Sequence, residues 1–347
     1  MGYLTVEGAV KRYGPVTALD GVSLGVEPGE FFTLLGPSGC GKTTILRSIA
    51  GFSDLTAGEI RIAGESLIGV PPHRRDIGMV FQDYAVFPHL TVAENVAFGL
   101  KARKVPAAEI RSRVGEILDM VRLGAMADRL PAAMSGGQQQ RIGIARAMVI
   151  RPRLLLMDEP LSNLDAKLRI ELRAEIRAIQ KAVGIAAIYV THDQEEALAI
   201  SDRICVMNQG RVEQIGTPQE IYGRPATRFV AGFVGTMNFL APGVGGIPPA
   251  PGAATRAVRP EHVRLADGDG EAAGSVQVEG TVSHYTYLGR EAHITVASPA
   301  GPIVAQIAAP SPDLSVETGR TVRLAFDAGQ MHGFDAEGLR IDGAVRP

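Results

Sequence analysis

A glycine-rich segment near the start of the chain has the residue types and spacing of a phosphate-binding loop. Residues 36–43 read Gly-Pro-Ser-Gly-Cys-Gly-Lys-Thr and satisfy the pattern G-x-x-x-x-G-K-[ST] in full. Glycines let backbone N–H groups turn onto phosphate oxygens, the Lys42 ammonium neutralises the β- and γ-phosphates during catalysis, and the Thr43 hydroxyl is placed for Mg²⁺. We therefore expect ATP to be bound by Gly36, Pro37, Ser38, Gly39, Cys40, Gly41, Lys42, Thr43 and Thr44.

A pair of carboxylates ends a second apolar run. Residues 154–159 read Leu-Leu-Leu-Met-Asp-Glu, and such a strand puts its last residues at the carboxyl edge of a parallel sheet, where ligands bind. Asp158 is expected to hold Mg²⁺ through water, and Glu159 to polarise the water that attacks the γ-phosphate. Acids after a strand more commonly just cap the next helix, but the phosphate loop in the same chain favours the catalytic interpretation.

These segments need strands and helices to hold them. Phe31–Leu35 is strand-like directly before the phosphate loop, and Thr43–Ala50 is helical directly after it. In Ala166–Val183 apolar residues recur at three- and four-residue steps, as on one face of a helix. This alternation predicts an α/β core with a mainly parallel sheet. Further strands are expected at Ile77–Phe81, Leu154–Met157 and Ala186–Val190, and a further helix at Gln138–Ile150.

The pattern changes after about Thr236. Ala241–Gly252 is rich in Pro and Gly and indicates a linker or an irregular edge. The short β-like runs that follow predict a small β-sandwich or barrel of the OB type, so we expect domains at residues 1–235 and 236–347. The expected strands of the second domain are Arg256–Leu265, Val276–Tyr287, Ala292–Val296, Ile303–Ile307, Val322–Phe326 and Leu339–Ile341.

The composition excludes several classes of protein. A chain of 347 residues suits one large and one small domain, and a formal net charge of -2 with no basic stripe argues against a nucleic-acid partner. Cys40 and Cys205 are the only cysteines, which excludes a disulfide framework and suits a reducing compartment. We expect no signal peptide, and no apolar run approaches the roughly 18 residues of a membrane helix. A membrane-spanning partner would therefore be another chain.

A further segment narrows the class of nucleotide-binding protein. Residues 134–141 read Met-Ser-Gly-Gly-Gln-Gln-Gln-Arg, and Ser135 can cap a helix that starts near Gly137. This segment resembles the signature of the ABC ATPases, with Met134 in the place of the usual Leu. The resemblance implies that the signature meets the γ-phosphate held by the opposite subunit, so that the protein works as a homodimer. The signature residues that would bind ATP are Ser135, Gly136, Gly137 and Gln138.

Other positions fit the same family in the expected order. Tyr13 resembles the aromatic residue on which adenine stacks, although a tyrosine packed on the core is an equal interpretation of this residue alone. Gln82 resembles the glutamine that senses Mg²⁺ and couples to the permease. Asp165, in the Ser-Asn-Leu-Asp segment 162–165, resembles the D-loop aspartate at the ATP site. His192 resembles the switch histidine that acts in catalysis with the glutamate.

The resemblance therefore implies a P-loop NTPase of the ABC cassette type, with a RecA-like core and a helical subdomain. Residues 233–240 and 258–262 resemble an accessory TOBE-like regulatory domain found on importer ATPases. The resemblance to importer ATPases also implies two partners: a separate integral membrane permease, and a solute-binding protein in the periplasm or outside the cell that is only an indirect partner. It further implies a peripheral location at the cytoplasmic face of the inner membrane. A polyamine, ferric iron or a phosphonate is the expected cargo; a sugar or sulfate is the alternative.

Three other classes of protein fit the sequence less well. A soluble ABC ATPase of translation or DNA repair typically carries two fused cassettes or long coiled-coil insertions, which this chain lacks. A P-loop kinase or GTPase leaves the Ser135 signature unexplained, and the base-reading Asn-Lys-x-Asp of GTPases is absent from the sequence. A degenerate cassette that binds ATP only for regulation is disfavoured by the intact Lys42, Asp158, Glu159 and His192.

Overall fold

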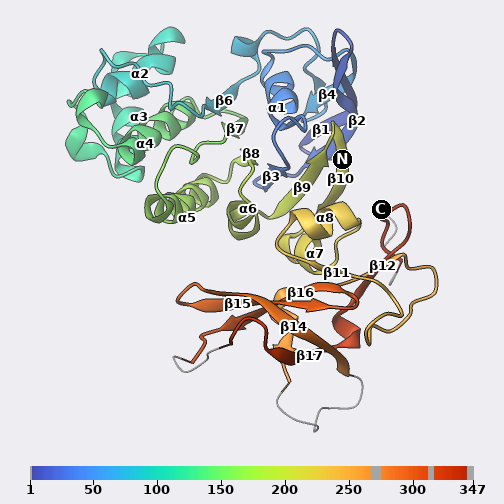
Figure 1. The fold of residues 1–347 in the computed structure, drawn as a ribbon. Coiled ribbons are helices and arrows are strands. Elements are labelled where there is room, and N and C mark those ends of the chain that lie inside the picture. The colour runs from blue at the N-terminus through green and yellow to red at the C-terminus, as the bar shows by residue number, and fades with distance from the viewer. Residues whose placement is uncertain (1, 267–274, 312–315, 342–347) are drawn as a thin grey trace. The chain divides into compact units, whose positions relative to one another are not determined.

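The computed structural model of the chain describes residues 2–266, 275–311 and 316–341. The chain divides into two compact units, residues 1–220 and 221–347. The first unit combines helices with parallel and antiparallel strands, and the second consists mostly of β-strands (Figure 1). The expected fold class, an α/β domain followed by a small β-rich domain, is confirmed.

A six-stranded sheet in the order β10-β9-β3-β8-β7-β6 forms the centre of the first unit. Strands β6, β7, β8, β3 and β9 run parallel, and β10 joins the edge antiparallel to β9. Their carboxyl ends therefore meet at one edge, where the phosphate loop and the acid pair begin. The strands are β3 Phe31–Leu35, β6 Ile77–Val80, β7 Leu154–Asp158, β8 Ala186–Thr191, β9 Arg203–Asn208 and β10 Arg211–Gly216.

A second, antiparallel sheet in the order β2-β1-β4-β5 belongs to the same unit. The alternating residues of Met1–Lys11 predict only its first strand, because β2 and β4 are too polar and glycine-rich to show a clear apolar alternation. Their buried faces join the core because both strands pair with β1. A local sequence pattern does not show such pairings between separate segments. The strands are β1 Leu4–Tyr13, β2 Val16–Val26, β4 Ala57–Ile62 and β5 Glu65–Ser66.

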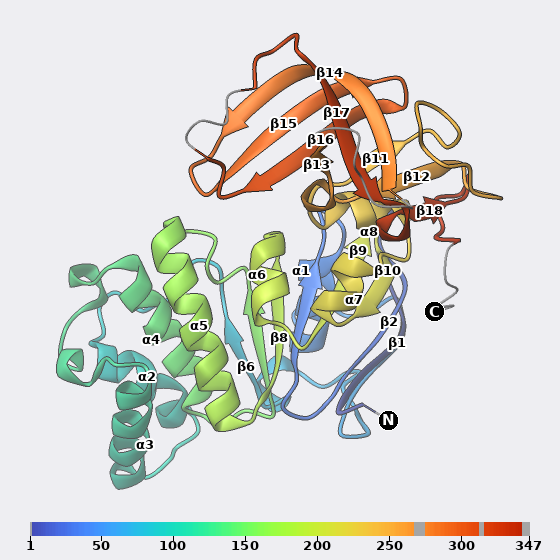
Figure 2. The same cartoon turned by 90° about the horizontal axis from the view of Figure 1, so that it is seen from below.

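Helices cover both faces of the six-stranded sheet. On one face, Ile45 and Leu46 of helix α1 pack with Leu154 of β7; on the other, Ile142 of α4 packs with Leu155 of the same strand. Helices α2, α3 and α4 gather at one side of the unit, as both views show (Figures 1 and 2). The helices are α1 Lys42–Ala50, α2 Val92–Ala102, α3 Ala107–Met120, α4 Gly136–Met148, α5 Ala166–Val183 and α6 Gln194–Ile200.

The second unit contains a three-stranded sheet, β11-β12-β18, and a five-stranded sheet, β13-β17-β14-β15-β16. Its core is aliphatic, with Ile294, Val296 and Ile303 fully buried. Helix α7 (Pro218–Gly223) crosses the boundary between the units, and α8 (Arg228–Phe233) follows it. The strands are β11 Asn238–Leu240, β12 Thr255–Val258, β13 Arg264–Leu265, β14 Ser275–Tyr287, β15 Glu291–Ser298, β16 Gly301–Ala308, β17 Thr321–Asp327 and β18 His332–Phe334.

Two expected strands of this unit differ in the structure. The run Arg256–Leu265 is divided into β12 and β13 by a 3-10 turn at Pro260–His262, because proline cannot donate to a strand ladder. Leu339–Ile341 forms only isolated bridges, from Leu339 to Thr227 and from Arg340 to Phe334. The remaining 3-10 turns are Pro72–Arg74, Gly124–Met126, Pro131–Ala133 and Ala328–Gln330.

The two compact units divide at 220/221, and the domain boundary expected at 235/236 stays a prediction. Arg259, which is buried, donates from Nη2 to Tyr222 O at 2.9 Å and from Nη1 to Ala231 O at 3.1 Å and Thr236 O at 3.0 Å. One side chain thus ties the segment that holds α7 and α8 to the β-rich unit. A sequence pattern cannot show such a link, because its partners lie 23 to 37 positions away.

Candidate functional site

The phosphate loop joins the carboxyl end of β3 to the start of α1. Gly41 has a φ of 106°, and a Cβ there would lie 2.7 Å from Ala18 O, so only glycine fits this position. Lys42 is 5% exposed, and its Nζ donates to Gly36 O at 2.7 Å and to Pro37 O at 3.0 Å. The ammonium is thus folded over the loop at the helix N-terminus, where backbone N–H groups attract anions.

Two side-chain oxygens, from Thr43 and Asp158, meet beside the loop. Thr43 Oγ1 donates to Asp158 Oδ1 at 3.2 Å, which joins the start of α1 to the end of β7. Burial raises the pKa of the Asp158 carboxyl above its ordinary value, and the hydroxyl of Thr43 acts in the opposite direction. A buried carboxylate of this kind is stabilised by a cation, and hard oxygen donors are what Mg²⁺ prefers. The residues present therefore fit Mg²⁺.

The second carboxylate of the pair faces His192. Glu159 Oε2 lies 3.1 Å from His192 Nδ1, so the end of β7 and the residue after β8 converge as expected. Glu159 has a φ of 44°, a left-handed conformation that non-glycine residues adopt rarely and mostly at functional sites. Its N–H donates to Val190 O at 3.1 Å, which fixes this turn against the neighbouring strand.

Gln82 follows β6, the strand next to β7, and its side chain is exposed. Asn163 Nδ2 donates to Gln82 O at 3.3 Å, which links this loop to the segment 162–165. Asp165 of that segment caps α5, because its Oδ1 accepts from Leu168 N at 3.0 Å. The carboxylate of Asp165 is therefore used within its own chain, and ATP contact by Asp165 stays a prediction.

The signature segment forms the start of α4, as expected. Gln138 N donates to Ser135 Oγ at 3.4 Å and Ser135 N donates to Gln138 Oε1 at 3.0 Å, a reciprocal capping box. The predicted cap is confirmed. A Cβ on Gly137 would lie 2.9 Å from a methyl of Leu168, so this glycine lets α4 approach α5 closely. Among the described residues, no hydrogen bond or ion pair joins this segment to the phosphate loop.

Tyr13 lies at the end of β1 and is 51% exposed. Its hydroxyl is 3.1 Å from Ser53 Oγ, and Lys11 Nζ lies 4.9 Å from the centre of its ring. The alternative interpretation of a tyrosine packed into the core is therefore wrong. An exposed ring of this kind is available for stacking on a base.

Sequence reasoning brought Lys42, Thr43, Asp158, Glu159 and His192 to one site, and the structure places them together. The sequence did not indicate Arg169 and Glu196, whose side chains bond to the loops that carry the site. No local pattern marks them, because they act through tertiary contacts.

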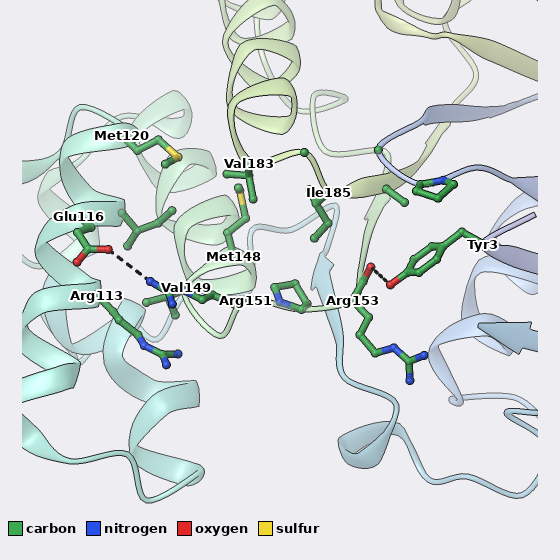
Figure 3. A pocket seen from close by; sticks show the side chains of 16 residues that line it. Tyr3, Arg113, Glu116, Met120, Met148, Val149, Arg151, Arg153, Val183 and Ile185 are labelled. Atoms are coloured by element: carbon green, nitrogen blue, oxygen red, sulfur yellow. Dashed lines mark hydrogen bonds and ion pairs between the residues drawn. The ribbon is translucent and has the colours of Figure 1, made fainter. Parts of the chain in front are cut away.

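A large cavity lies elsewhere in the first unit. Figure 3 shows Met120 and Glu116 of α3, Met148 of α4 and Ile185 before β8, which line this cavity. Its volume is about 620 Å³. Arg151 and Glu116 are 3.7 Å apart at its rim. It lies at the amino ends of β7 and β8, opposite the edge that carries the acid pair, and none of the predicted site residues lines it.

Two family models match parts of the chain. One, for the ABC transporter family, matches residues 19–162, and one for the TOBE domain matches residues 256–334. The first match contains the phosphate loop, the signature segment and the acid pair. The solved structure of cbiO1 from Clostridium perfringens, described as part of the ABC transporter complex cbiONQ, superposes with a TM-score of 0.59 at 31% identity, covering 63% of this chain and 90% of that chain.

Two curated proteins are similar along most of both units. The spermidine/putrescine import ATP-binding protein PotA of Thermobifida fusca (strain YX) is 50% identical over 328 residues, covering 84% of this chain and 83% of that protein. The protein of the same name from Rubrobacter xylanophilus is 47% identical over 348 residues, covering 93% of this chain and 91% of that protein.

Proposed function

The chain belongs to the family of ABC transporter ATP-binding subunits that carry a TOBE domain, and from this premise we propose that it drives the import of a polyamine. It is an ABC-type ATPase coupled to import. The observation that supports a polyamine is the similarity over both units to proteins named for spermidine and putrescine import. Ferric iron and a phosphonate, which the sequence left open, have no such support among these relatives.

Uptake by intact cells tests the cargo. Deletion of the gene should abolish uptake of labelled spermidine or putrescine and leave uptake of ferric iron, phosphonate, sugar and sulfate unchanged. The wild-type gene should restore uptake, and the Glu159→Gln gene should not. If the deletion abolished uptake of one of the other solutes and left polyamine uptake normal, the proposed polyamine cargo would be refuted. The assignment as an importer would remain intact.

The residues of the site divide the work of hydrolysis. We propose that Lys42 exchanges its loop carbonyls for β- and γ-phosphate oxygens, which places the γ-phosphate in front of Glu159. Glu159 then orients the attacking water. His192, whose Nδ1 lies 3.1 Å from Glu159 Oε2, holds this carboxylate in place and contacts the γ-phosphate. Tyr13 stacks on the adenine ring.

Mg²⁺, when bound, neutralises charge on the phosphate oxygens. Thr43 and Asp158 are the residues that would hold it, and Gln82 offers a further oxygen from the loop after β6. The raised pKa of Asp158 supports this role, because a cation would offset the cost of burying the carboxylate.

A second copy of the chain completes the site in this proposal. The phosphate loop starts α1, whereas the signature starts α4, and these helices cover opposite faces of the sheet. Two chains arranged head to tail under a two-fold axis can place the signature of each on the ATP of the other. Ser135, Gly136, Gly137 and Gln138 then contact the γ-phosphate across the interface, beside Asp165.

A patch of exposed aromatic side chains is the proposed docking surface for a permease. Phe52 is 56% exposed and packs 6.3 Å from Phe81, while Phe98 is 47% exposed and packs 4.5 Å from Phe87. Segment 81–90, which directly follows β6 and contains Gln82, contributes Phe81 and Phe87 to these pairs. Aromatic side chains that are exposed to solvent and packed in pairs are typical of binding surfaces.

Among the described residues, no helix has both the length and the apolar character to cross a bilayer. We propose that the chain is held at the cytoplasmic face of the inner membrane by the permease, and that a solute-binding protein outside the cytoplasm contacts only that permease. The β-rich unit is proposed to regulate the ATPase.

A further inference from the structure

The first turn of α5 places Arg169 between two loops of the ATP site. Its Nη2 donates to Leu164 O at 3.2 Å, within segment 162–165. Its Nη1 donates to Asp193 Oδ2 at 3.2 Å, directly after His192 in the chain. One guanidinium therefore connects the loop that enters α5 with the loop that carries the switch histidine.

Glu196 extends this connection to the other side of His192. It is 4% exposed, and its Oε2 accepts from Thr191 Oγ1 and from Tyr189 Oη at 2.8 Å each. Its Oε1 lies 3.6 Å from Arg169 Nε. A buried carboxylate with two hydroxyl donors and a neighbouring guanidinium is a rigid anchor.

His192 has little packing of its own, because 57% of its side chain is exposed. Its two neighbours are fixed instead, and Asp193 N donates to Thr191 Oγ1 at 2.9 Å. A cavity of about 20 Å³ bounded by Glu159, Arg169 and His192, among others, has room for one water molecule. The histidine is therefore placed by its loop, and the loop is held by Arg169.

We infer that Arg169 is a positioning residue for ATP hydrolysis: it fixes His192 against Glu159 and makes this placement depend on segment 162–165. The inference rests on the proposed roles of His192 and Glu159. In the proposed dimer, Asp165 lies beside the signature of the second subunit. Because Arg169 bonds to the neighbouring Leu164, it couples closure of that dimer to alignment of the histidine. ATP itself is held by other groups, so its binding should not depend on Arg169.

A planar guanidinium suits this task better than an ammonium. Its separate N–H groups reach Leu164 O and Asp193 Oδ2 at once, in fixed directions. Lysine would offer one point charge on a flexible stem and could hold only one of the two loops. Arg169→Lys should therefore fall between the wild type and Arg169→Met in turnover.

Steady-state kinetics with a matched control test the inference. In Arg169→Met, kcat should fall by about 10-fold to 100-fold, the effect of a small misplacement of a catalytic group, while KM for ATP stays within about two-fold. The control is Arg177→Met on the same helix, because Arg177 pairs with Asp202 outside the site. Its kcat should stay near that of the wild type.

A double-mutant cycle separates positioning from mere stability. If Arg169 acts through the histidine, Arg169→Met should cause no further loss of single-turnover rate in a His192→Ala background. The inference would be overturned if Arg169→Met lowered the single-turnover rate equally in the wild-type and His192→Ala backgrounds. It would also be overturned if Arg169→Met alone left kcat unchanged. Should Arg169→Met fail to fold, Arg169→Lys carries the same cycle. A wild-type chain that does not hydrolyse ATP would instead refute the proposed function.

Discussion

Nδ1 of His192 lies 3.1 Å from Oε2 of Glu159, and the glutamate that makes this contact is held at a φ of 44°. For a non-glycine residue this conformation costs on the order of 1 kcal/mol, so surrounding bonds must maintain it. Glu159 N donates to Val190 O, and Ser162 Oγ donates to Glu159 O at 3.0 Å. The backbone therefore presents the carboxylate to the histidine.

Glu159→Gln should separate binding from hydrolysis. The amide keeps the shape of the side chain but lacks the negative charge that polarises and orients the water, so kcat should fall by about 10²-fold to 10³-fold, as when one positioned catalytic group is lost. Labelled ATP should bind with unchanged affinity. The control Glu195→Gln, at an exposed carboxylate nearby, should retain full activity. Near-normal turnover of Glu159→Gln would mean that another residue positions the water.

Asp158→Asn should make the chain more stable at neutral pH, although it abolishes the proposed metal site. Burial raises the pKa of this carboxyl in the folded state. Between the ordinary Asp pKa of about 3.9 and the raised folded value, the folded chain binds more protons than the unfolded one, so stability falls as pH rises. Ionised Asp158 is then a destabilising contribution that asparagine removes.

Urea unfolding in metal-free buffer measures this effect. The gain in the free energy of unfolding from Asp158→Asn should be largest at neutral pH and should shrink as pH falls through the raised pKa. Asp202→Asn is a contrasting control, because this carboxylate accepts from Phe31 N at 2.8 Å and pairs with Arg177, and its loss should destabilise the chain. A destabilised Asp158→Asn at pH 7 would contradict the argument.

The local parts of the site could be predicted from the sequence. The phosphate loop and the Ser135 cap depend on residues a few positions apart, and both were placed correctly. His192 required the family resemblance, because its partner Glu159 is 33 positions away. Arg169 and Glu196 were missed, since an arginine and a glutamate on helices have no pattern that distinguishes them from surface charges.

The fold shows the same division. Strands that are continuous apolar runs, such as β7 and β8, were predicted from composition, but the order of the sheet was not, because β3 lies between β8 and β9. The link from Arg259 to Tyr222 O could not be predicted either, because it is a tertiary contact between residues 37 positions apart.

Phe98→Glu should weaken attachment to the permease without affecting the ATP site. An aromatic anchor in an interface typically contributes about 2 kcal/mol or more, which corresponds to about 30-fold in affinity. Co-purification with the permease and solute uptake should fall together, and ATP binding should persist. Ile68→Glu, at another exposed apolar residue that is 52% exposed, is the control. Normal uptake by Phe98→Glu would remove Phe98 from the interface.

Segment 81–90 offers a test of the alternative that the aromatic patch is part of the hydrophobic core of the first unit. Asn95 is fully buried, accepts from Phe87 N at 2.7 Å and donates to Phe87 O and Leu90 O. Asn95→Leu should therefore lower the thermal midpoint, whereas Phe98→Glu should not. If both lowered it equally, the aromatic pair would belong to the core of the first unit.

A chain truncated after Glu220 should bind and hydrolyse ATP, because every predicted site residue precedes this point. A chain that ends at Gly235 should behave worse in solution. It retains α7 and α8 but lacks Arg259, which donates to Ala231 O, and it lacks Ala257 and Phe334, which pack with the buried Ala231 of α8. Light scattering should show aggregation of the longer fragment only. Loss of nucleotide binding in the shorter one would mean that the β-rich unit supports the ATP site.

Mixing two inactive variants tests the shared site most directly. Lys42→Ala removes the phosphate ligand and Ser135→Arg blocks the signature, so neither homodimer has a working site. In an equal mixture about half of the dimers combine one intact phosphate loop with one intact signature. Since each has one working site of two, activity should return to about a quarter of the wild-type value if the sites act independently.

Two controls decide what a negative result means. Loss of the Ser135 cap costs about 1 kcal/mol, so the folding of Ser135→Arg is checked by its thermal midpoint. Dimerisation is then measured by light scattering on Glu159→Gln with saturating ATP and Mg²⁺, because trapped ATP should hold the two chains together. Dimers without restored activity would mean that both sites must fire together. A Glu159→Gln chain that stays monomeric at high concentration would exclude an ATP site shared between α1 of one chain and α4 of the other.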